Sequence, residues 1–274
     1  MNAESELGRG RWRGLLTTGQ QLPRTDASRR QLVTETVLVL GVSLGASAIW
    51  ATLSLINKLT QPVALGQQTT AMNQAVTPDR PWLDLAYQVA QIGIGVVPAL
   101  LALFLLTRDD SRARRLVGAD ARHPLRDLAH GAGLAALIGL PGLALYLGAR
   151  AAGLNTTVAA ANLDSTWWAV PVLVLAAVEN AVLEEVVMVA YLFTRWEQAG
   201  WALPTIIIGS ALIRGTYHLY QGFGGGLGNV AMGLILGVVY ARTRRVMPLI
   251  VAHTILDVVA FVGYTLLRAH VSWL

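Results

Sequence analysis

The sequence predicts an all-α membrane protein, a polytopic transmembrane bundle of about seven spans, or eight helices in all, around an intramembrane polar cavity. Three observations lead to this class. Only 14% of the 274 residues are charged, whereas soluble domains carry roughly 25%. Apolar residues make up 54% of the chain, and the mean hydropathy is +0.51. Long apolar runs recur along the chain, and a membrane-spanning helix needs about 20 such residues.

Seven segments are candidates for spans, of which the fifth and sixth are short. They are residues 33–57, 83–107, 126–148, 167–193, 202–220, 226–241 and 246–268. Before them, residues 1–31 form a polar, arginine-rich arm that we expect to be mobile and cytoplasmic, near anionic lipid. We divide the rest into amino-terminal transmembrane helices over residues 32–148 and a carboxy-terminal transmembrane core over residues 149–274. We expect the Gln- and Thr-rich connection from Thr60 to Pro81 to be solvated and exterior.

Basic residues alternate between the connections, which predicts how the chain is oriented. The arm, the connection after the second segment and the ends of the fourth and sixth segments hold 16 Lys and Arg residues, against four in the other connections and the tail. Basic loops stay on the cytoplasmic side of a membrane. We therefore expect a multi-pass protein of a plasma membrane, embedded in the lipid bilayer, with its amino terminus in the cytoplasm.

The composition excludes several other classes. The chain has no cysteine, which excludes disulfides, thiolate catalysis and cysteine-ligated metal sites. The net charge of +5 would suggest nucleic acid only if the basic residues shared one solvated face, and here they follow the span boundaries, so we expect no nucleic-acid partner. No internal repeat is visible, which argues against a transporter built from duplicated halves. Gly233 and Gly237 form a small-xxx-small pair that predicts close helix contact.

Ionisable and amide side chains are costly inside a bilayer and usually mark function, and we single out those of three apolar segments. They are Glu179, Asn180, Glu184 and Glu185 in the fourth segment, Arg214 and His218 in the fifth, and His253 and Asp257 in the seventh. A spacing of four residues places members of a pair on one helix face. Glu185 is turned about 100° from Glu184, so we expect only one of the two to react. Glu35, near the start of the first segment, is expected to be an interfacial or packing residue.

Carboxylates and histidines in a dry bundle can hydrolyse a peptide bond in two ways. A carboxylate can act as a general base on water while histidines stabilise an oxyanion or protonate the leaving amine. Alternatively, zinc or another divalent metal held by His218, His253 and Glu184 could activate the water. The sequence has no HExxH motif, so any metal ligands would come from different helices. Whether a metal is bound stays open at this point, and no cofactor is certain.

In their order along the chain, these residues resemble the CPBP (Abi) family of intramembrane proteases, which is related to the type II CAAX prenyl endopeptidases. That family has a double Glu followed after three residues by Arg, then an aromatic residue four before a His, then a His four before Asn or Asp. Glu184 and Glu185, His218, and His253 with Asp257 match these positions. The resemblance covers about residues 167–268.

The resemblance implies an intramembrane endopeptidase whose substrate is a membrane-proximal or lipid-modified peptide or protein. It implies that Glu184 activates water with help from His218, and that His253 with Asp257 binds the carbonyl oxygen or orients the water. Glu185 would share or support the role of Glu184, and we expect Asn180 to support the site. The family is often called a metalloprotease family, although a metal-free glutamate mechanism is also argued for it.

Two positions depart from the family pattern. Val189 stands where the family has Arg, and Arg214 stands where it has an aromatic residue. We therefore predict that Arg214 supplies, from the neighbouring helix, the charge that Val189 lacks. If the site has instead lost its reaction, the chain would be an inactive membrane scaffold or maturation partner of the same fold. A third hypothesis is an ion or proton transporter that uses the buried carboxylates as a relay. The oligomeric state is not fixed by the sequence.

The depths of the two histidines set a further constraint. His218 lies about 24 Å along its segment, whereas His253 lies only about 10 Å along its own. They cannot meet in straight, untilted helices. We therefore expect that the hairpin of the fifth and sixth segments stops short of the far surface, or that the fifth segment is strongly tilted.

Overall fold

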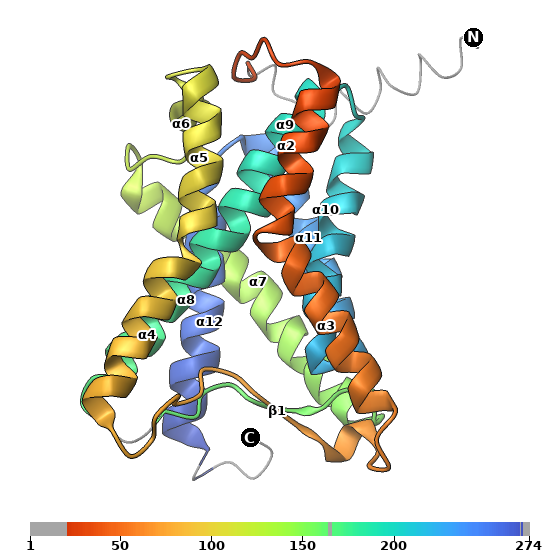
Figure 1. Ribbon diagram of the computed structural model, residues 1–274, viewed down its shortest axis with the longest axis vertical. Helices are drawn as coiled ribbons and strands as arrows, with labels where there is room; N and C mark the ends of the chain where they lie inside the picture. Colours follow the sequence, from red (N-terminus) through yellow and green to blue (C-terminus); the bar gives the residue numbers. More distant parts are fainter. Residues whose placement is uncertain (1–20, 164–165, 269, 271–274) are drawn as a thin grey trace.

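The computed structural model describes residues 21–163, 166–268 and 270, and its regular structure is almost entirely helical (Figure 1). The α-helices are α2 (Arg29–Gly41), α3 (Leu44–Leu59), α4 (Pro81–Gly95), α5 (Val97–Asp109), α6 (Ala113–Leu116), α7 (Pro124–Ala151), α8 (Ala169–Glu184), α9 (Leu192–Gln198), α10 (Leu203–Tyr217), α11 (Phe223–Thr243) and α12 (Met247–Leu267). A π-helix, η2 (Glu185–Tyr191), joins α8 to α9, and short 3-10 turns lie at η1 (Leu65–Gln67) and η3 (Leu219–Gln221). All seven predicted apolar segments are therefore helical.

The first helix begins earlier than the sequence predicted. Ser28 caps α2 through a capping box, in which its hydroxyl accepts from the Gln31 amide and the Gln31 side chain accepts from the Ser28 amide at 2.8 Å. Residues 1–20 of the predicted arm lie outside the described residues. The predicted first span is also broken, because α2 and α3 meet at an angle of 51°.

The count of seven spans is not confirmed. By length and composition, the described residues hold four helices that could cross a membrane, namely α4 with α5 taken together, α7, α11 and α12. The bent pair of α2 and α3 would make a fifth. The 15 residues of α10 rise about 22 Å, less than the roughly 30 Å of a hydrocarbon core. The fourth apolar segment is divided between α8, which ends at Glu184, and the π-helix, which begins at Glu185.

The chain runs back and forth between two ends of the molecule (Figure 1). The start of α2, the end of α5, α6 and α9 lie at one end, and β1 and the end of α12 lie at the other. The arginine-rich connections gather at the first end, as the alternation of basic residues predicted, and we call it the arginine-rich end. Large apolar side chains point outward between the two ends, including Leu140 at 74% exposed and Ile94 at 71%. This distribution suits a chain surrounded by lipid.

The predicted all-α architecture has one small exception, at the end opposite the arginine-rich end. β1 (Thr69–Ala71) pairs in parallel with β2 (Thr157–Ala159), so the connection expected to be only solvated is partly ordered. Next to this pair, the Thr156 amide and hydroxyl both donate to the carbonyl oxygen of Gln221, at 3.0 and 2.9 Å. Lys58 donates to the carbonyl oxygen of Tyr220. These contacts fix the turn that follows α10, which begins at His218.

Glycines let α10 and α11 pack closely. A methyl group at Gly233 would lie 2.9 Å from the Cα of Ala211, and one at Gly215 would lie 2.3 Å from a methyl of Val230. Real side chains do not approach so closely, so both positions require glycine in this packing. The predicted close contact at Gly233 is confirmed. Behind this hairpin, the π-helix forms the centre of the apolar core, with every residue from Glu185 to Tyr191 buried.

Candidate functional site

The two adjacent glutamates lie where the α-helix α8 passes into the π-helix η2. Glu184 is 8% exposed and Glu185 is fully buried. Single π-helical turns inside α-helices are rare and occur frequently at functional sites. The sequence predicted that only one of the two carboxylates reacts, and this stays a prediction. In the structure both carboxylates contact the same guanidinium. A guanidinium presents several N–H donors in a fixed fork, so it can reach two carboxylates that point in different directions.

The guanidinium that both glutamates contact belongs to Arg214, which is 1% exposed. Its Nη2 lies 2.6 Å from Glu185 Oε1, and its Nη1 lies 3.2 Å from Glu184 Oε2. The predicted pairing of Arg214 with Glu185 is therefore present in the structure. Val189, the position where the family has Arg, is buried among apolar side chains at 2% exposed. A buried charge persists only when it is paired, so the two glutamates and Arg214 form one electrostatic unit.

His253 lies between Glu185 and Asp257. Its Nδ1 is 2.9 Å from Glu185 Oε1, and its Nε2 is 3.7 Å from Asp257 Oδ1. An ionised carboxylate only accepts hydrogen bonds, so the Nδ1 of His253 carries a proton and donates it to Glu185. The distance from Nε2 to Asp257 is too long for a hydrogen bond, so this nitrogen remains available to another partner. Asn180 interacts with the carboxylate of Asp257 from the preceding part of α8.

His218 and Tyr217 approach Glu184 from the end of α10. The Tyr217 hydroxyl donates to Glu184 Oε2 at 2.8 Å. The Nδ1 of His218 lies 3.0 Å from the carbonyl oxygen of Arg214, which can only accept, so Nδ1 carries the proton. In a neutral ring the Nε2 of His218 then holds a lone pair, and it lies 3.9 Å from Glu184 Oε1. Two acceptors at this separation can both receive a hydrogen bond from one water molecule.

The structure thus brings together the predicted residues Glu184, Glu185, Arg214, His218 and His253, with Asp257 and Asn180 at one side. Their side chains contact one another directly, through ion pairs and hydrogen bonds. Glu179 lies on a different side of α8. A methyl group at Gly95, where α4 meets α5, would come within 2.3 Å of the Glu179 carboxylate.

The predicted metal site does not fit these side chains. The residues that the structure describes contain no group of three or more His, Asp and Glu arranged to hold a metal ion. The guanidinium of Arg214 already supplies a positive charge to both glutamates. Each histidine donates from Nδ1, His218 to a backbone carbonyl and His253 to Glu185, which leaves Nε2 of both rings without a hydrogen bond. As the structure describes them, the expected zinc ligands His218, His253 and Glu184 do not form a group that could hold a metal ion.

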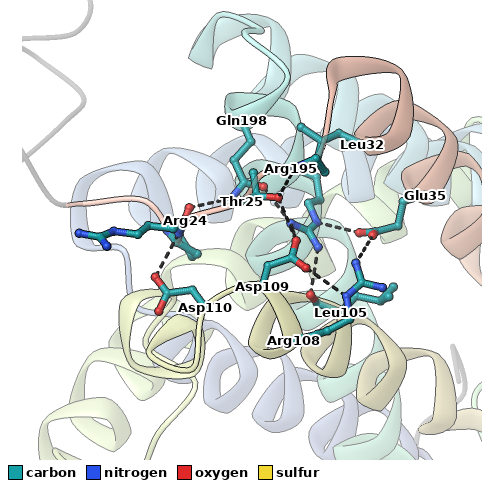
Figure 2. A network of polar contacts seen from close by, with 12 residues as sticks. Arg24, Thr25, Leu32, Glu35, Leu105, Arg108, Asp109, Asp110, Arg195 and Gln198 are labelled. Atoms are coloured by element: carbon teal, nitrogen blue, oxygen red, sulfur yellow. Dashed lines mark hydrogen bonds and ion pairs between the residues drawn. The ribbon is translucent and has the colours of Figure 1, made fainter.

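A second buried ion-pair cluster lies at the arginine-rich end, and the sequence did not predict it (Figure 2). Arg195 is fully buried, although its place after the fourth segment suggested a basic cytoplasmic connection. Its Nε donates to Glu35 Oε1 at 2.7 Å, and its Nη1 lies 2.9 Å from Asp109 Oδ2. Glu35 also accepts from the Tyr191 hydroxyl at 2.9 Å. Because Tyr191 is the last residue of η2, this cluster fixes the far end of the π-helix that carries the glutamates.

The same cluster holds the chain that precedes α2 (Figure 2). The Thr25 hydroxyl donates to Asp109 at 3.0 Å, the Arg24 amide donates to Asp110 at 3.1 Å, and the Gln198 side chain donates to the carbonyl oxygen of Pro23 at 2.8 Å. Residues 23–25 are therefore anchored to α5 and α9, and this part of the predicted arm has a defined position.

A comparison with known families found one match, over the part of the chain that contains the cluster. Residues 166–259 match the family described as type II CAAX prenyl endopeptidase Rce1-like. The matched residues cover about a third of the chain and include all the residues of the glutamate, arginine and histidine cluster. The resemblance to the CAAX-type proteases is confirmed over this part of the chain. No curated protein and no solved structure matches the chain.

Proposed function

We propose that the chain, through its Rce1-like residues 166–259, is an intramembrane endopeptidase that hydrolyses a peptide bond with water activated by Glu184. The observation that carries this proposal is the geometry of two acceptors. Glu184 Oε1 and the Nε2 of His218 are 3.9 Å apart, and both can accept a hydrogen bond from one water molecule. A water that donates both protons in this way directs its lone pairs away from them, toward a substrate carbonyl.

The proposed reaction assigns each proton to an atom of the chain. Glu184 removes a proton from the water as the oxygen attacks the carbonyl carbon, and the C–O bond forms. The tetrahedral intermediate then expels the amine, the C–N bond breaks, and the proton on Glu184 passes to the leaving nitrogen. The hydrogen bond from Tyr217 and the ion pair with Arg214 hold the Glu184 carboxylate in place during both steps. Neither step consumes any other reactant.

Two groups are positioned to stabilise the oxyanion. A protonated His253 donates from Nδ1 to Glu185 and can donate from Nε2, whose distance of 3.7 Å from Asp257 leaves it uncommitted. Among the described residues, Arg214 Nη1 has an ion pair with Glu184 but no hydrogen-bond partner. A buried N–H group without a hydrogen-bond partner is rare, and one beside the proposed general base Glu184 can donate to the negative charge that develops on the substrate oxygen. Asp257 and Asn180 orient His253 from its open side.

The substrate we propose is a membrane-associated peptide or protein, cleaved near the bilayer and presented from a prokaryotic plasma membrane. The test is cleavage of a panel of fluorogenic membrane peptides, some with a lipid-modified carboxyl terminus, by the purified full chain in detergent. We expect cleavage that a chelator does not reduce, and its loss in His253→Ala. Cleavage that a chelator abolishes would contradict the metal-free mechanism.

One observation favours a second function, that of an inactive scaffold or maturation partner. Arg214 neutralises charge on both glutamates from a position where the family has an aromatic residue, and this pairing could also serve stability alone. A folded chain that cleaves no member of the panel would favour this function. Gradient-dependent ion flux in proteoliposomes would instead indicate the third hypothesis, that the chain is an ion or proton transporter.

A further inference from the structure

A cavity of about 570 Å³ opens at the arginine-rich end, away from the glutamate and histidine cluster. It lies in the connection between α5 and α7, around the short helix α6. Arg112, Arg114, Arg115, Asp120 and Arg122 are among the residues that line it. Four guanidinium groups and one carboxylate therefore surround a single space.

The walls of this cavity are fixed by contacts within the chain. Arg112 donates twice to Asp110, from Nε and from Nη2, each at 3.1 Å. These hydrogen bonds, with one from the Arg24 amide, hold the pKa of Asp110 well below its usual range, so this carboxylate stays ionised. Asp120 pairs with Arg122 at 2.8 Å and with Arg245 at 3.1 Å. These contacts hold Arg112, Asp120 and Arg122 at the cavity.

The charge inside the cavity is not balanced. Arg112 and Arg122 are paired with carboxylates, but Arg114 and Arg115 have no carboxylate partner within residues 21–163, 166–268 and 270. Both are exposed. Two adjacent guanidinium groups on a fixed wall are suited to a phosphate group, which accepts several charge-assisted hydrogen bonds at once. The cavity thus favours an anion with phosphate chemistry.

The position of the cavity indicates where such a phosphate would come from. It lies between the ends of α4–α5 and α7, both of which are long and apolar enough to cross a membrane. The first turns of α7 expose Leu125 at 81% and Leu128 at 53%, immediately after the cavity residue Arg122 in the chain. Basic groups beside apolar side chains at the end of a membrane helix match the headgroup and the upper acyl chains of a lipid.

We propose that this cavity binds the phosphate of an anionic membrane lipid, with Arg114 and Arg115 as the binding residues and Leu125 and Leu128 against the acyl chains. The site is independent of the proposed peptidase. A bound lipid there would connect α5 to α7 across the loop that carries α6, and so stabilise the arginine-rich end of the molecule.

The experiment titrates short-chain phosphatidylglycerol, short-chain phosphatidylcholine or inorganic phosphate into the purified full chain in a neutral detergent. The variant is Arg114→Gln with Arg115→Gln. The matched control is Arg29→Gln with Arg30→Gln, another adjacent and exposed arginine pair at the same end, at the start of α2. Both variants remove the same charge. Melting curves of each protein without lipid report whether it is folded.

We expect phosphatidylglycerol to bind more tightly than phosphatidylcholine, and binding to weaken about 30-fold in the Arg114 and Arg115 variant, since each basic residue contributes about 1 kcal/mol to anionic lipid binding. The control should bind like the wild type. Equal losses in both variants would show a diffuse charge effect and overturn the proposal. If inorganic phosphate bound as tightly as the lipid, the cavity would be a site for soluble phosphate. That result would overturn the proposal of a lipid ligand.

Discussion

One arginine side chain determines the electrostatics of the candidate site. Arg214 is the cation shared by Glu184 and Glu185, and without it two adjacent buried carboxylates would face each other. Removal of one partner from a buried ion pair costs about 3–5 kcal/mol. The two departures from the family motif, at residues 189 and 214, are therefore explained as one exchange: the charge that Val189 lacks reaches the site from α10.

This exchange predicts the outcome of a double substitution. Arg214→Phe should lower the melting temperature and abolish cleavage, because Glu185 keeps only His253 as a partner. Adding Val189→Arg to that variant should restore part of both, since it returns a cation to the helix of Glu185. Peptide cleavage and thermal unfolding of the three proteins measure this. A double variant as inactive as Arg214→Phe alone would show that the two positions do not compensate.

Tyr217 gives a second test at the scale of one residue. Its hydroxyl donates to Glu184 at 2.8 Å, and a hydrogen bond to a charged group is worth about 1.5–3 kcal/mol. Tyr217→Phe should therefore lower kcat about 10- to 100-fold with little change in KM, because the base loses its orientation and the peptide site is intact. Tyr87→Phe, at an exposed tyrosine of α4, is the control. An unchanged kcat would show that Tyr217 does not orient Glu184 for the reaction.

The sequence predicted most of the residues of this cluster, because charged side chains inside apolar segments stand out and a spacing of four places pairs on one face. Tyr217 gave no such signal. It is the last residue of α10, and its contact with Glu184 depends on where that helix ends. Arg195 was also misread, because a basic residue after an apolar segment is usually solvated. Its burial depends on Glu35 and Asp109, which come from two other helices.

At the scale of elements, the pairing of α10 with α11 sets the position of His218. The two helices touch at Gly233 and Gly215, and neither glycine has room for a methyl group. α10 has 15 residues, whereas α11 has 21 and is long enough to cross a membrane, so the predicted short hairpin stays a prediction. The π-helix and the bend between α2 and α3 could not be predicted, because both arise from packing against other helices rather than from a local pattern.

Substitutions at two glycines of α11 distinguish the effect of helix packing on stability from the effect of helix propensity. Gly233→Ala should destabilise the protein by about 1–3 kcal/mol, because the new methyl group would lie 2.9 Å from the Cα of Ala211. Gly228→Ala should be neutral or stabilising by up to about 1 kcal/mol, since its methyl group would meet Leu145 at an ordinary 3.4 Å. The melting temperatures of both variants, compared with that of the wild type, measure these changes in stability. If Gly233→Ala were as stable as Gly228→Ala, the close contact of α10 with α11 would be wrong.

At the scale of the whole molecule, two buried ion-pair clusters hold the π-helix at its two ends. Glu184 and Glu185 bind Arg214 at one end, and Tyr191 binds Glu35 in the Arg195 cluster at the other. The alternation of basic residues predicted which connections share an end. The sequence did not predict how many of the segments are long enough to cross a membrane, because charges and helix breaks shorten several of them.

This arrangement predicts that a substitution in the Arg195 cluster also reduces cleavage at the glutamate cluster. Glu35→Gln removes the charge that pairs with Arg195 and should lower stability by about 1–3 kcal/mol. It should also reduce cleavage, because Tyr191 no longer anchors the π-helix to an ionised carboxylate. Asp26→Asn, an exposed acid in the same part of the chain, is the matched control and should change neither. Loss of stability without any loss of cleavage would mean that the two clusters are uncoupled.

The central claim is that Glu184 is the general base, and a pair of glutamates on one helix tests it most directly. The measurement is the single-turnover rate of peptide cleavage by wild type, Glu184→Gln and Glu179→Gln, with the melting temperature of each protein recorded beside it. Glu179 also lies on α8, and its carboxylate faces Gly95, where a methyl group would come within 2.3 Å of it. The account predicts a loss of about 1,000-fold or more in Glu184→Gln, within the range seen when catalytic groups are removed, and nearly full activity in Glu179→Gln. A folded Glu184→Gln protein that cleaves at the wild-type rate would contradict it.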